Sequence, residues 1–231
     1  MLTVAETGST NADLLALAAR GEEEGVWLRA ERQTAGRGRQ GRDWSSPTGN
    51  LYASTLVQAR PDDPPAPSLA LVSAVALAET ISVLGCPAVT IKWPNDLLLD
   101  GAKLAGILLE RSGNAIVIGF GVNLASHPSI DGRRTASLAG RLWIHSVAEL
   151  YDHLTVEFAR WLGIWRAQGL APVVARWQAQ AHAPGTPLNA NLADGTTITG
   201  TYDGLAPDGA LRLRLADGSV HVIHAGDVFL V

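Results

Sequence analysis

Cysteine is almost absent from this chain of 231 residues, because Cys86 is the single example. One cysteine excludes an intrachain disulfide framework, and it excludes a metal site built from clustered cysteines. A chain without disulfides suits a reducing compartment. We therefore expect a cytoplasmic protein.

Charged residues are also scarce, and the net charge has the wrong sign for general binding to nucleic acid. Charged residues make up 17% of the chain, with 18 Lys and Arg against 22 Asp and Glu, so the formal net charge is −4. General nucleic-acid binders carry a basic excess. We expect no nucleic-acid partner. A hydrophobic content of 47% excludes wholesale disorder.

Long apolar runs are missing as well. The longest, residues 68–85, includes Glu79 and falls short of the ~20 apolar residues that a membrane span needs. Its alanine-rich composition predicts a buried core helix instead. Near the start of the chain, Glu6 and Asp13 stand where a signal peptide needs an unbroken apolar core. We expect no membrane partner.

The first 180 residues alternate between strand and helix patterns. Start and stop signals predict a helix over 9–21, and residues 146–180 read as two helices broken near Gly169 and Pro172. A Gly- and Arg-rich segment without apolar period predicts a long loop over 33–50. Predicted strands cover 25–31, 50–59, 89–93, 97–99, 103–110 and 114–124, with an Asp100-Gly101 hairpin signal between two of them.

The pattern changes at about Ala183. Helical periodicity disappears, and short alternating runs such as 211–215 and 220–224 are separated by Asp-Gly pairs. Regular turn signals between short strands are typical of a small β-barrel, here of about fifty residues. We predict two domains, residues 1–183 and residues 184–231.

The first segment with candidate chemistry is TAGRGRQGRDW, residues 34–44. Its glycines have the spacing of a dinucleotide site: Gly36, Gly38 and Gly41. The residues that follow are poor helix formers, which argues against that reading. Three arginines lie between and after the glycines: Arg37, Arg39 and Arg42. Guanidinium groups on a flexible backbone in an acidic protein indicate a local anion site, with a solvated loop as the alternative.

The second segment is KWPNDLLLDGAKLAGILLE, residues 92–110. Pro94 interrupts regular structure just before Asn95 and Asp96, which places these two side chains at the mouth of a strand. A carboxylate beside a carboxamide can hold Mg²⁺ or orient an amine. Lys103 follows the predicted hairpin, so its ammonium group can return toward Asp96. The alternative is an ordinary hairpin with exposed charges.

Two shorter motifs are weaker on their own. In GFGVNLASHP, residues 119–128, glycines flank an aromatic residue at a strand end and Asn123 follows. This combination suits a planar ligand but also suits a core strand with a tight exit. In the other motif, Ser9-Thr10-Asn11, the residues read as a helix N-cap that can also contact a ligand.

Together these segments resemble the bacterial biotin protein ligases. The matching motifs are STN at 9–11, QTAGRGRQGRDW at 33–44, GNLY at 49–52, KWPNDL at 92–97, KLAGILLE at 103–110 and GFGVNL at 119–124. The resemblance covers nearly the whole chain. It implies an α+β fold, in which a catalytic domain with a mixed sheet like that of class II aminoacyl-tRNA synthetases precedes a small SH3-like β-barrel. Because STN begins at residue 9, we expect no N-terminal DNA-binding domain and no repressor role.

The resemblance also implies a reaction. Biotin and ATP, with Mg²⁺, form biotinyl-5′-AMP and pyrophosphate, and a lysine of a biotin carboxyl carrier protein then takes the biotinyl group. The nucleophiles belong to the substrates, so the enzyme positions anions and excludes water. Monomers and dimers both occur on this scaffold, so a homodimer stays open.

Site residues carry over by motif position. Those that resemble the family's catalytic residues are Lys103, Arg39 and Asp96, with Asp96 also a candidate Mg²⁺ ligand. Those that resemble biotin contacts are Ser9, Thr10, Asn11, Gln33, Gly36, Arg37, Gly38, Arg39, Lys103 and Gly106. Those that resemble ATP contacts are Arg37, Arg39, Arg42, Trp44, Asn95, Lys103 and Asn123. We expect the loop at 33–46 to order on ligand binding, and we expect Arg133 and Arg134 in the loop at 125–138 to be solvated.

Three rival functions remain. A lipoate or octanoate ligase or transferase shares the catalytic architecture, but Cys86, the sole thiol, lies outside every motif and reads as structural. A biotin-binding sensor without chemistry would not need Lys103, Asp96 and Arg39. A nucleotide-binding dehydrogenase is the weakest reading.

Overall fold

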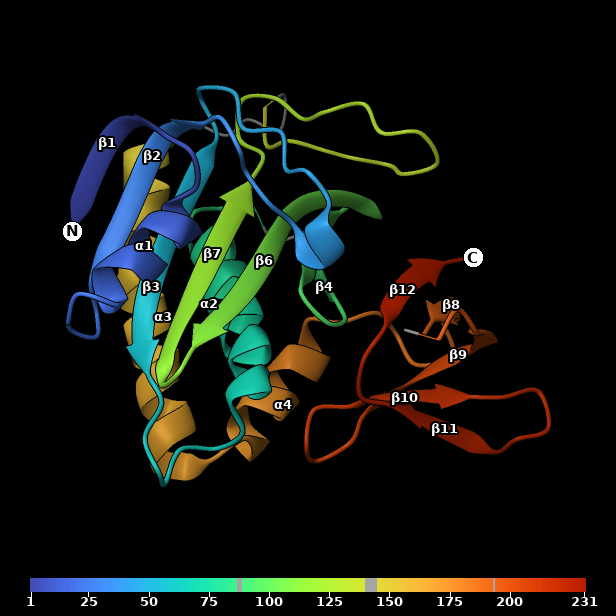
Figure 1. Ribbon diagram of the computed structural model, residues 1–231. Coiled ribbons are helices and arrows are strands. Elements are labelled where there is room, and N and C mark those ends of the chain that lie inside the picture. The colour runs from blue at the N-terminus through green and yellow to red at the C-terminus, as the bar shows by residue number, and fades with distance from the viewer. Residues whose placement is uncertain (87–88, 140–144, 193) are drawn as a thin grey trace.

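A seven-stranded sheet forms the centre of the larger part of the computed structural model, which describes residues 1–86, 89–139, 145–192 and 194–231 (Figure 1). The strands are β1 (Leu2–Thr7), β2 (Trp27–Gln33), β3 (Leu51–Gln58), β4 (Val89–Lys92), β5 (Asp96–Leu99), β6 (Ala102–Ser112) and β7 (Ala115–Val122). They lie in the order β1-β2-β3-β7-β6-β5-β4. Only β1 and β2 pair in parallel, so the sheet is mixed, as expected.

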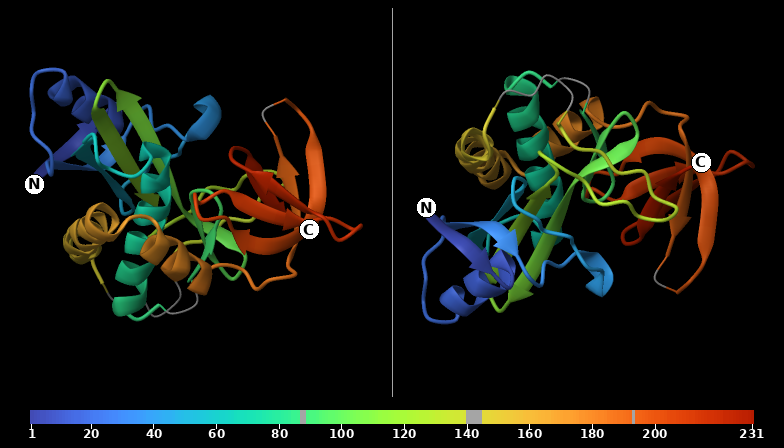
Figure 2. Two further views of the ribbon diagram at one scale, coloured as in Figure 1. Left: turned by 90° about the horizontal axis from the view of Figure 1, so that it is seen from below. Right: turned by 90° about the horizontal axis from the view of Figure 1, so that it is seen from above.

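Helices cover the two faces of this sheet unequally (Figures 1 and 2). Helix α1 (Thr10–Ala18) packs Leu14 against Leu28 and Val117 on one face. The other face is covered by α2 (Leu69–Val83), α3 (Val147–Gln168) and α4 (Ala171–Ala179). Alternate strand residues point to opposite faces, so neighbours such as Trp27 and Leu28 join different clusters.

Helix α2 is the core helix that the sequence predicted. The segment Ala66–Val83, which includes the short 3₁₀ helix η2 (Ala66–Ser68), is long and apolar enough to cross a membrane by composition. Two thirds of it is buried inside the fold, against the sheet and α3. Burial on nearly all sides explains why the helix is apolar all round rather than amphipathic.

The hairpin signal at Asp100-Gly101 is confirmed. These residues join β5 to β6 with φ values of 49° and 74°, which is the left-handed backbone that Asp-Gly favours in a two-residue hairpin. Strand β1 was not predicted. Its residues are largely exposed and carry no apolar run, and parallel pairing with β2 at the edge of the sheet creates the strand.

The C-terminal residues form a second, five-stranded antiparallel sheet. Its strands are β8 (Pro187–Asn191), β9 (Thr197–Leu205), β10 (Leu211–Arg214), β11 (Val220–Ile223) and β12 (Asp227–Leu230), in the order β11-β10-β9-β8-β12. The indole Nε1 of Trp93 donates to Gly209 O at 3.1 Å, across the junction of the two sheets. Lys92 at the end of β4 donates to Val228 O of β12 at 2.8 Å, so β12 lies beside the end of β4 at the edge of the larger sheet (Figure 1).

Candidate active site

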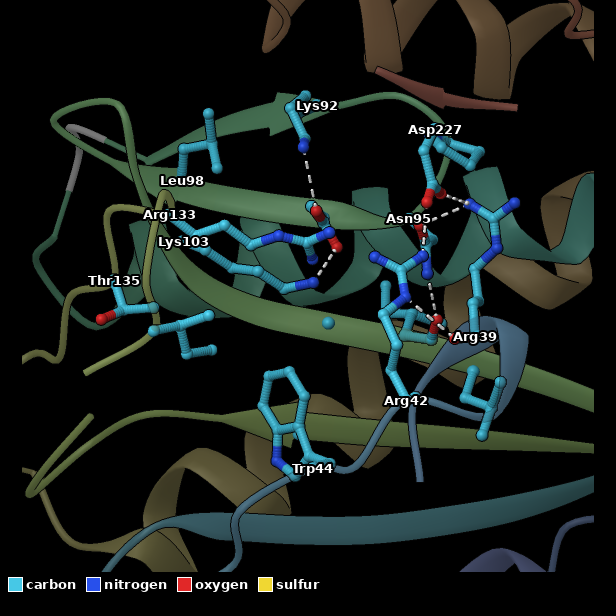
Figure 3. A pocket seen from close by; sticks show the side chains of 18 of the residues that line it. Arg39, Arg42, Trp44, Lys92, Asn95, Leu98, Lys103, Arg133, Thr135 and Asp227 are labelled. Atoms are coloured by element: carbon cyan, nitrogen blue, oxygen red, sulfur yellow. Dashed lines mark hydrogen bonds and ion pairs between the residues drawn. The ribbon is translucent and has the colours of Figure 1, made fainter. Parts of the chain in front are cut away.

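A cavity of about 880 Å³ lies where the loop at 33–50, the ends of β5 to β7 and strand β12 meet (Figure 3). Nearly all of the predicted site residues line it. They are Ser9, Thr10, Asn11, Gln33, Arg37, Gly38, Arg39, Arg42, Trp44, Asn95, Asp96, Lys103 and Gly106. Segments almost 100 residues apart in the chain thus converge on one site.

Gly36 and Asn123 do not line the cavity, and both have structural roles. A Cβ on Gly36 would lie 2.5 Å from Ser46 Oγ and from Trp44 O, so only glycine lets the two limbs of the loop approach. Asn123 is buried, and its Nδ2 donates to Ala136 O at 3.1 Å. It anchors the loop at 125–138 rather than facing the cavity.

The cavity is strongly cationic although the chain is acidic. Seven cationic side chains line it: Arg37, Arg39, Arg42, Lys92, Lys103, Arg133 and Arg134. Three carboxylates oppose them: Asp43, Asp96 and Asp227. The side chains that line the cavity therefore sum to a charge of +4 in a chain of net charge −4, which concentrates the attraction for anions in this cleft.

The inner end of the cavity, at the start of α1, presents neutral polar side chains. Ser9 caps α1 by accepting from Ala12 N. Gln33 Oε1 accepts from Thr10 N at 2.9 Å and from Thr10 Oγ1 at 3.1 Å. Gln33 Nε2 donates to Ser46 Oγ at 3.1 Å. This end therefore offers neutral hydrogen-bonding groups held in a fixed orientation.

The arginine loop reaches strand β12. The 3₁₀ turn η1 (Arg39–Gly41) projects Arg39 toward Asn95 Oδ1 and Gly226 O, both at 3.2 Å. Arg39 also pairs with Asp227 at 3.4 Å, and Arg42 pairs with the other oxygen of the same carboxylate. Two guanidinium groups that would repel each other are thus held together by one carboxylate (Figure 3).

A second charge cluster surrounds Asp96. Lys103 Nζ lies 2.6 Å from Asp96 Oδ1, and Lys92 Nζ lies 3.1 Å from Asp96 Oδ2. Burial alone would raise the pKa of Asp96, but Lys103 and Lys92 outweigh that effect and hold the pKa below its usual range. Lys92 also donates to Val228 O at 2.8 Å, which ties this cluster to β12.

These contacts decide whether Asp96 suits a Mg²⁺ ion. Each of its two oxygens already faces an ammonium group, and the described residues contain no cluster of three or more His, Cys, Asp or Glu side chains that would hold a metal. Mg²⁺ is usually held by one or two carboxylates together with waters and substrate phosphates, and two ammonium groups against the same carboxylate repel a cation there. The predicted metal role of Asp96 therefore does not fit this arrangement, and Asp96 instead serves as the partner of two lysines.

Trp44 forms one wall of the cavity between Lys103 and the sheet. Lys103 Nζ lies 5.5 Å from the centre of its ring. A Cβ on Gly121 would lie 2.6 Å from the indole, and one on Gly106 would lie 3.1 Å from it. Both glycines thus make room for the ring, which assigns Gly106 a role in packing Trp44.

Several cavity residues were missed or misjudged from the sequence. Lys92 belongs to the KWPND motif but was given no role, and Asp227 and Phe229 lie in a short strand without any motif signal. Arg133 and Arg134 are exposed, as expected, yet both line the cavity. Arg133 lies 5.5 Å from the ring centre of Phe229 and so connects the loop at 125–138 to β12.

Comparison with known proteins identifies relatives of this chain. Residues 8–123 match the biotin/lipoate A/B protein ligase family, and residues 185–231 match the biotin protein ligase C-terminal domain. A biotin–[acetyl-CoA-carboxylase] ligase of Paracoccus denitrificans is 38% identical, with 98% of each chain covered. A biotin–[acetyl-CoA-carboxylase] ligase of Mycobacterium tuberculosis is 36% identical, and the match covers 97% of this chain and 86% of the relative.

Solved structures show the same fold. A biotin protein ligase from Aquifex aeolicus, in complex with biotin and ATP, superposes with a TM-score of 0.87 at 23% identity and covers 100% of this chain and 99% of its own. The expected α+β architecture is therefore confirmed. With matches to both family domains and relatives similar over nearly the full length, the chain belongs to the biotin protein ligases.

Proposed function

We propose that this protein activates biotin with ATP and transfers it to a lysine of a biotin carboxyl carrier protein. The observation that carries the proposal is one cavity with two ends of different chemistry. The end at Thr10 and Gln33 is neutral and polar, and the end at Arg39, Arg42 and Lys103 is cationic. Biotin has a neutral bicyclic head and a carboxylate tail, so this polarity matches it.

In the first step, a carboxylate oxygen of biotin attacks the α-phosphorus of ATP. The new O–P bond forms as the bond to pyrophosphate breaks, giving biotinyl-5′-AMP. Lys103 lies at the cationic end of the cavity, and its ammonium group can neutralise the carboxylate and phosphate oxygens that meet there. Asp96 holds Lys103 in place through their ion pair of 2.6 Å.

In the second step, a neutral amine of the carrier lysine attacks the acyl carbon and AMP leaves. No side chain of the enzyme needs to act as nucleophile. The role of the cavity is to hold the reactive anhydride away from water until the carrier arrives. Trp44 and the loop at 33–46 cover this region, and we infer that the loop orders further around the adenylate.

ATP–pyrophosphate exchange tests the first step. We expect exchange in the presence of biotin. We expect none with lipoate, with octanoate or without any acid. Exchange supported by lipoate or octanoate would instead place the protein with the sister enzymes. Tight biotin binding without exchange would indicate a sensor that lacks the chemistry.

Transfer to a purified carrier domain tests the second step. We expect one biotin per carrier domain in the presence of ATP, detected by mass spectrometry. A carrier in which the acceptor lysine is replaced by arginine is the matched control and should stay unmodified. Labelling of the control at other lysines would mean that the enzyme does not direct the transfer.

A further inference from the structure

Ser54 lies behind the neutral end of the cavity and has no role in the chemistry described above. It is in the middle of β3, it is fully buried, and it does not itself line the cavity. Its Oγ lies 2.7 Å from Thr10 Oγ1 and 2.6 Å from Asn11 Oδ1. The hydroxyl therefore supports two residues that do line the cavity.

The hydroxyl hydrogen of Thr10 is used in a hydrogen bond to Gln33 Oε1. Gln33 Oε1 accepts from both Thr10 N and Thr10 Oγ1, while Gln33 Nε2 donates to Ser46 Oγ, which in turn donates to Trp44 O at 3.0 Å. This chain of donors fixes the orientation of the Gln33 amide. Thr10 Oγ1 consequently faces Ser54 as an acceptor.

The amide hydrogens of Asn11 are likewise used in hydrogen bonds. Its Nδ2 donates to Leu108 O at 3.3 Å and to Glu110 Oε2 at 2.9 Å, which uses both hydrogens. Its Oδ1 faces Ser54. Gly119, the β7 partner of Ser54 in the sheet, leaves the space for this amide, because a Cβ there would overlap Asn11 Oδ1. Ser54 thus faces two fixed acceptors and shares its single hydroxyl hydrogen between them.

We propose that Ser54 is a positioning residue for substrate selection, which fixes Thr10 and Asn11 as hydrogen-bond acceptors at the inner end of the cavity. This inference rests on the proposed function. An acid whose head carries N–H donors, such as the cyclic urea of biotin, pairs with these oxygens. A saturated hydrocarbon tail offers no donor, so the acceptor that does not receive the single Ser54 hydrogen would stay unpaired against it, which disfavours its binding.

Biotin binding by the full chain, measured by calorimetry without ATP, tests this role. Without the Ser54 hydroxyl, Thr10 and Asn11 lose the group that orients their oxygens, so we expect Ser54→Ala to weaken biotin binding about tenfold, equivalent to ~1.4 kcal/mol. Ser73→Ala is the matched control, because Ser73 is equally buried and donates to Leu69 O within α2, outside the cavity lining. Its biotin affinity should stay within about twofold of the unmodified protein.

Two further readouts separate positioning from general damage. The KM for ATP should stay unchanged in Ser54→Ala, while the preference for biotin over octanoate in exchange should fall together with biotin affinity. The effect of Ser54→Ala should also largely vanish in a Thr10→Val background if Ser54 acts through Thr10.

Unchanged biotin affinity in a folded Ser54→Ala variant, or additive effects with Thr10→Val, would overturn the inference. Should Ser54→Ala not fold, Ser54→Cys keeps a similar volume with a weaker donor and should bind biotin severalfold more weakly, and unchanged affinity there would overturn the inference equally. Absence of biotin binding in the unmodified protein would instead refute the proposed function.

Discussion

At the scale of single residues, the two lysines of this chain, Lys92 and Lys103, share one buried carboxylate. All other cationic side chains besides histidine are arginines. Both lysines contact Asp96, and only Lys103 also lies against Trp44 on the cavity wall. Lysine offers a compact charge on a flexible stem, which suits contact with oxygens that change their charge during a reaction.

Lys103→Ala should abolish most of the adenylation. If Lys103 stabilises charge as one oxyanion donor does, its removal should slow biotin-dependent exchange about 100- to 1,000-fold. Biotin-dependent ATP–pyrophosphate exchange is the measurement. Lys92→Ala is the internal control, because it removes the other Asp96 partner and should reduce the rate less. Near-normal exchange in Lys103→Ala would contradict the assigned role.

Arg39→Gly should loosen the hold on the intermediate rather than prevent its synthesis. Arg39 links the loop to Asn95, Gly226 and Asp227, and glycine removes all three links. We expect more free biotinyl-AMP and indiscriminate labelling of an added lysine-rich protein such as serum albumin. Both lysines of the enzyme are paired with Asp96, so the added protein gives the clearer readout. Unchanged selectivity would remove Arg39 from this role.

At the scale of elements, an ion-pair network attaches α3 to the loop before β2. Arg166 on α3 pairs with Glu24 at 2.6 Å and with Asp63 at 3.2 Å, and it donates to Gln58 O. The hydrogen bond from Arg166 is the main reason why the pKa of Glu24 is lowered to about 2. This network holds α3 to the loop before β2 and to the end of β3.

Glu24→Gln should destabilise the protein at neutral pH and not in strong acid. Because the folded-state pKa is depressed, the stabilisation is fully present above about pH 4.5 and is lost as the pH falls toward 2. We expect a loss of about 1–2 kcal/mol at pH 7, allowing for solvent screening. Denaturant unfolding at several pH values measures it. Glu157→Gln, which breaks the Glu157–Arg160 pair within α3, should cost less than ~0.5 kcal/mol. A loss for Glu24→Gln that does not depend on pH would contradict the ionic explanation.

At the scale of the whole molecule, the C-terminal sheet is part of the active site. Three consecutive residues of the chain, Gly226, Asp227 and Val228, contact Arg39, Arg42 and Lys92 through backbone or side-chain oxygens. The cationic end of the cavity therefore requires both sheets. A protein without the second sheet would lose the carboxylate that holds two arginines together.

Asp227→Asn should impair ATP binding more than biotin binding. Without the carboxylate, Arg39 and Arg42 repel each other and the loop loses its ion pairs with β12. We expect the KM for ATP to rise about tenfold, equivalent to ~1.4 kcal/mol, with little change in the KM for biotin. Asp203→Asn is the matched control, since Asp203 also pairs with two arginines, Arg212 and Arg214, outside the cavity lining. Equal effects of the two variants would show a loss of stability rather than of positioning.

Much of the fold followed from local patterns. Helix α2, the Asp-Gly hairpin before β6 and the strands after Ala183 were predictable. Each of them is determined by residues that are close together in the sequence. Strand β1 was not, because an exposed edge strand has no apolar pattern and forms through pairing with β2. The motifs also identified most of the cavity-lining residues, but they missed Asp227 and Phe229 on β12 and included Gly36 and Asn123, which do not line the cavity.

The sequence by itself determined the family, the core helix and the motif residues, because glycine, proline and arginine spacing is local information. Only the tertiary structure decided the partners of those residues. It paired Asp96 with two lysines instead of leaving it for a metal, joined Arg39 and Arg42 to Asp227 across 185 residues or more, and placed Ser54 behind Thr10. Such contacts depend on which segments the sheets bring together, and no spacing within one segment encodes them.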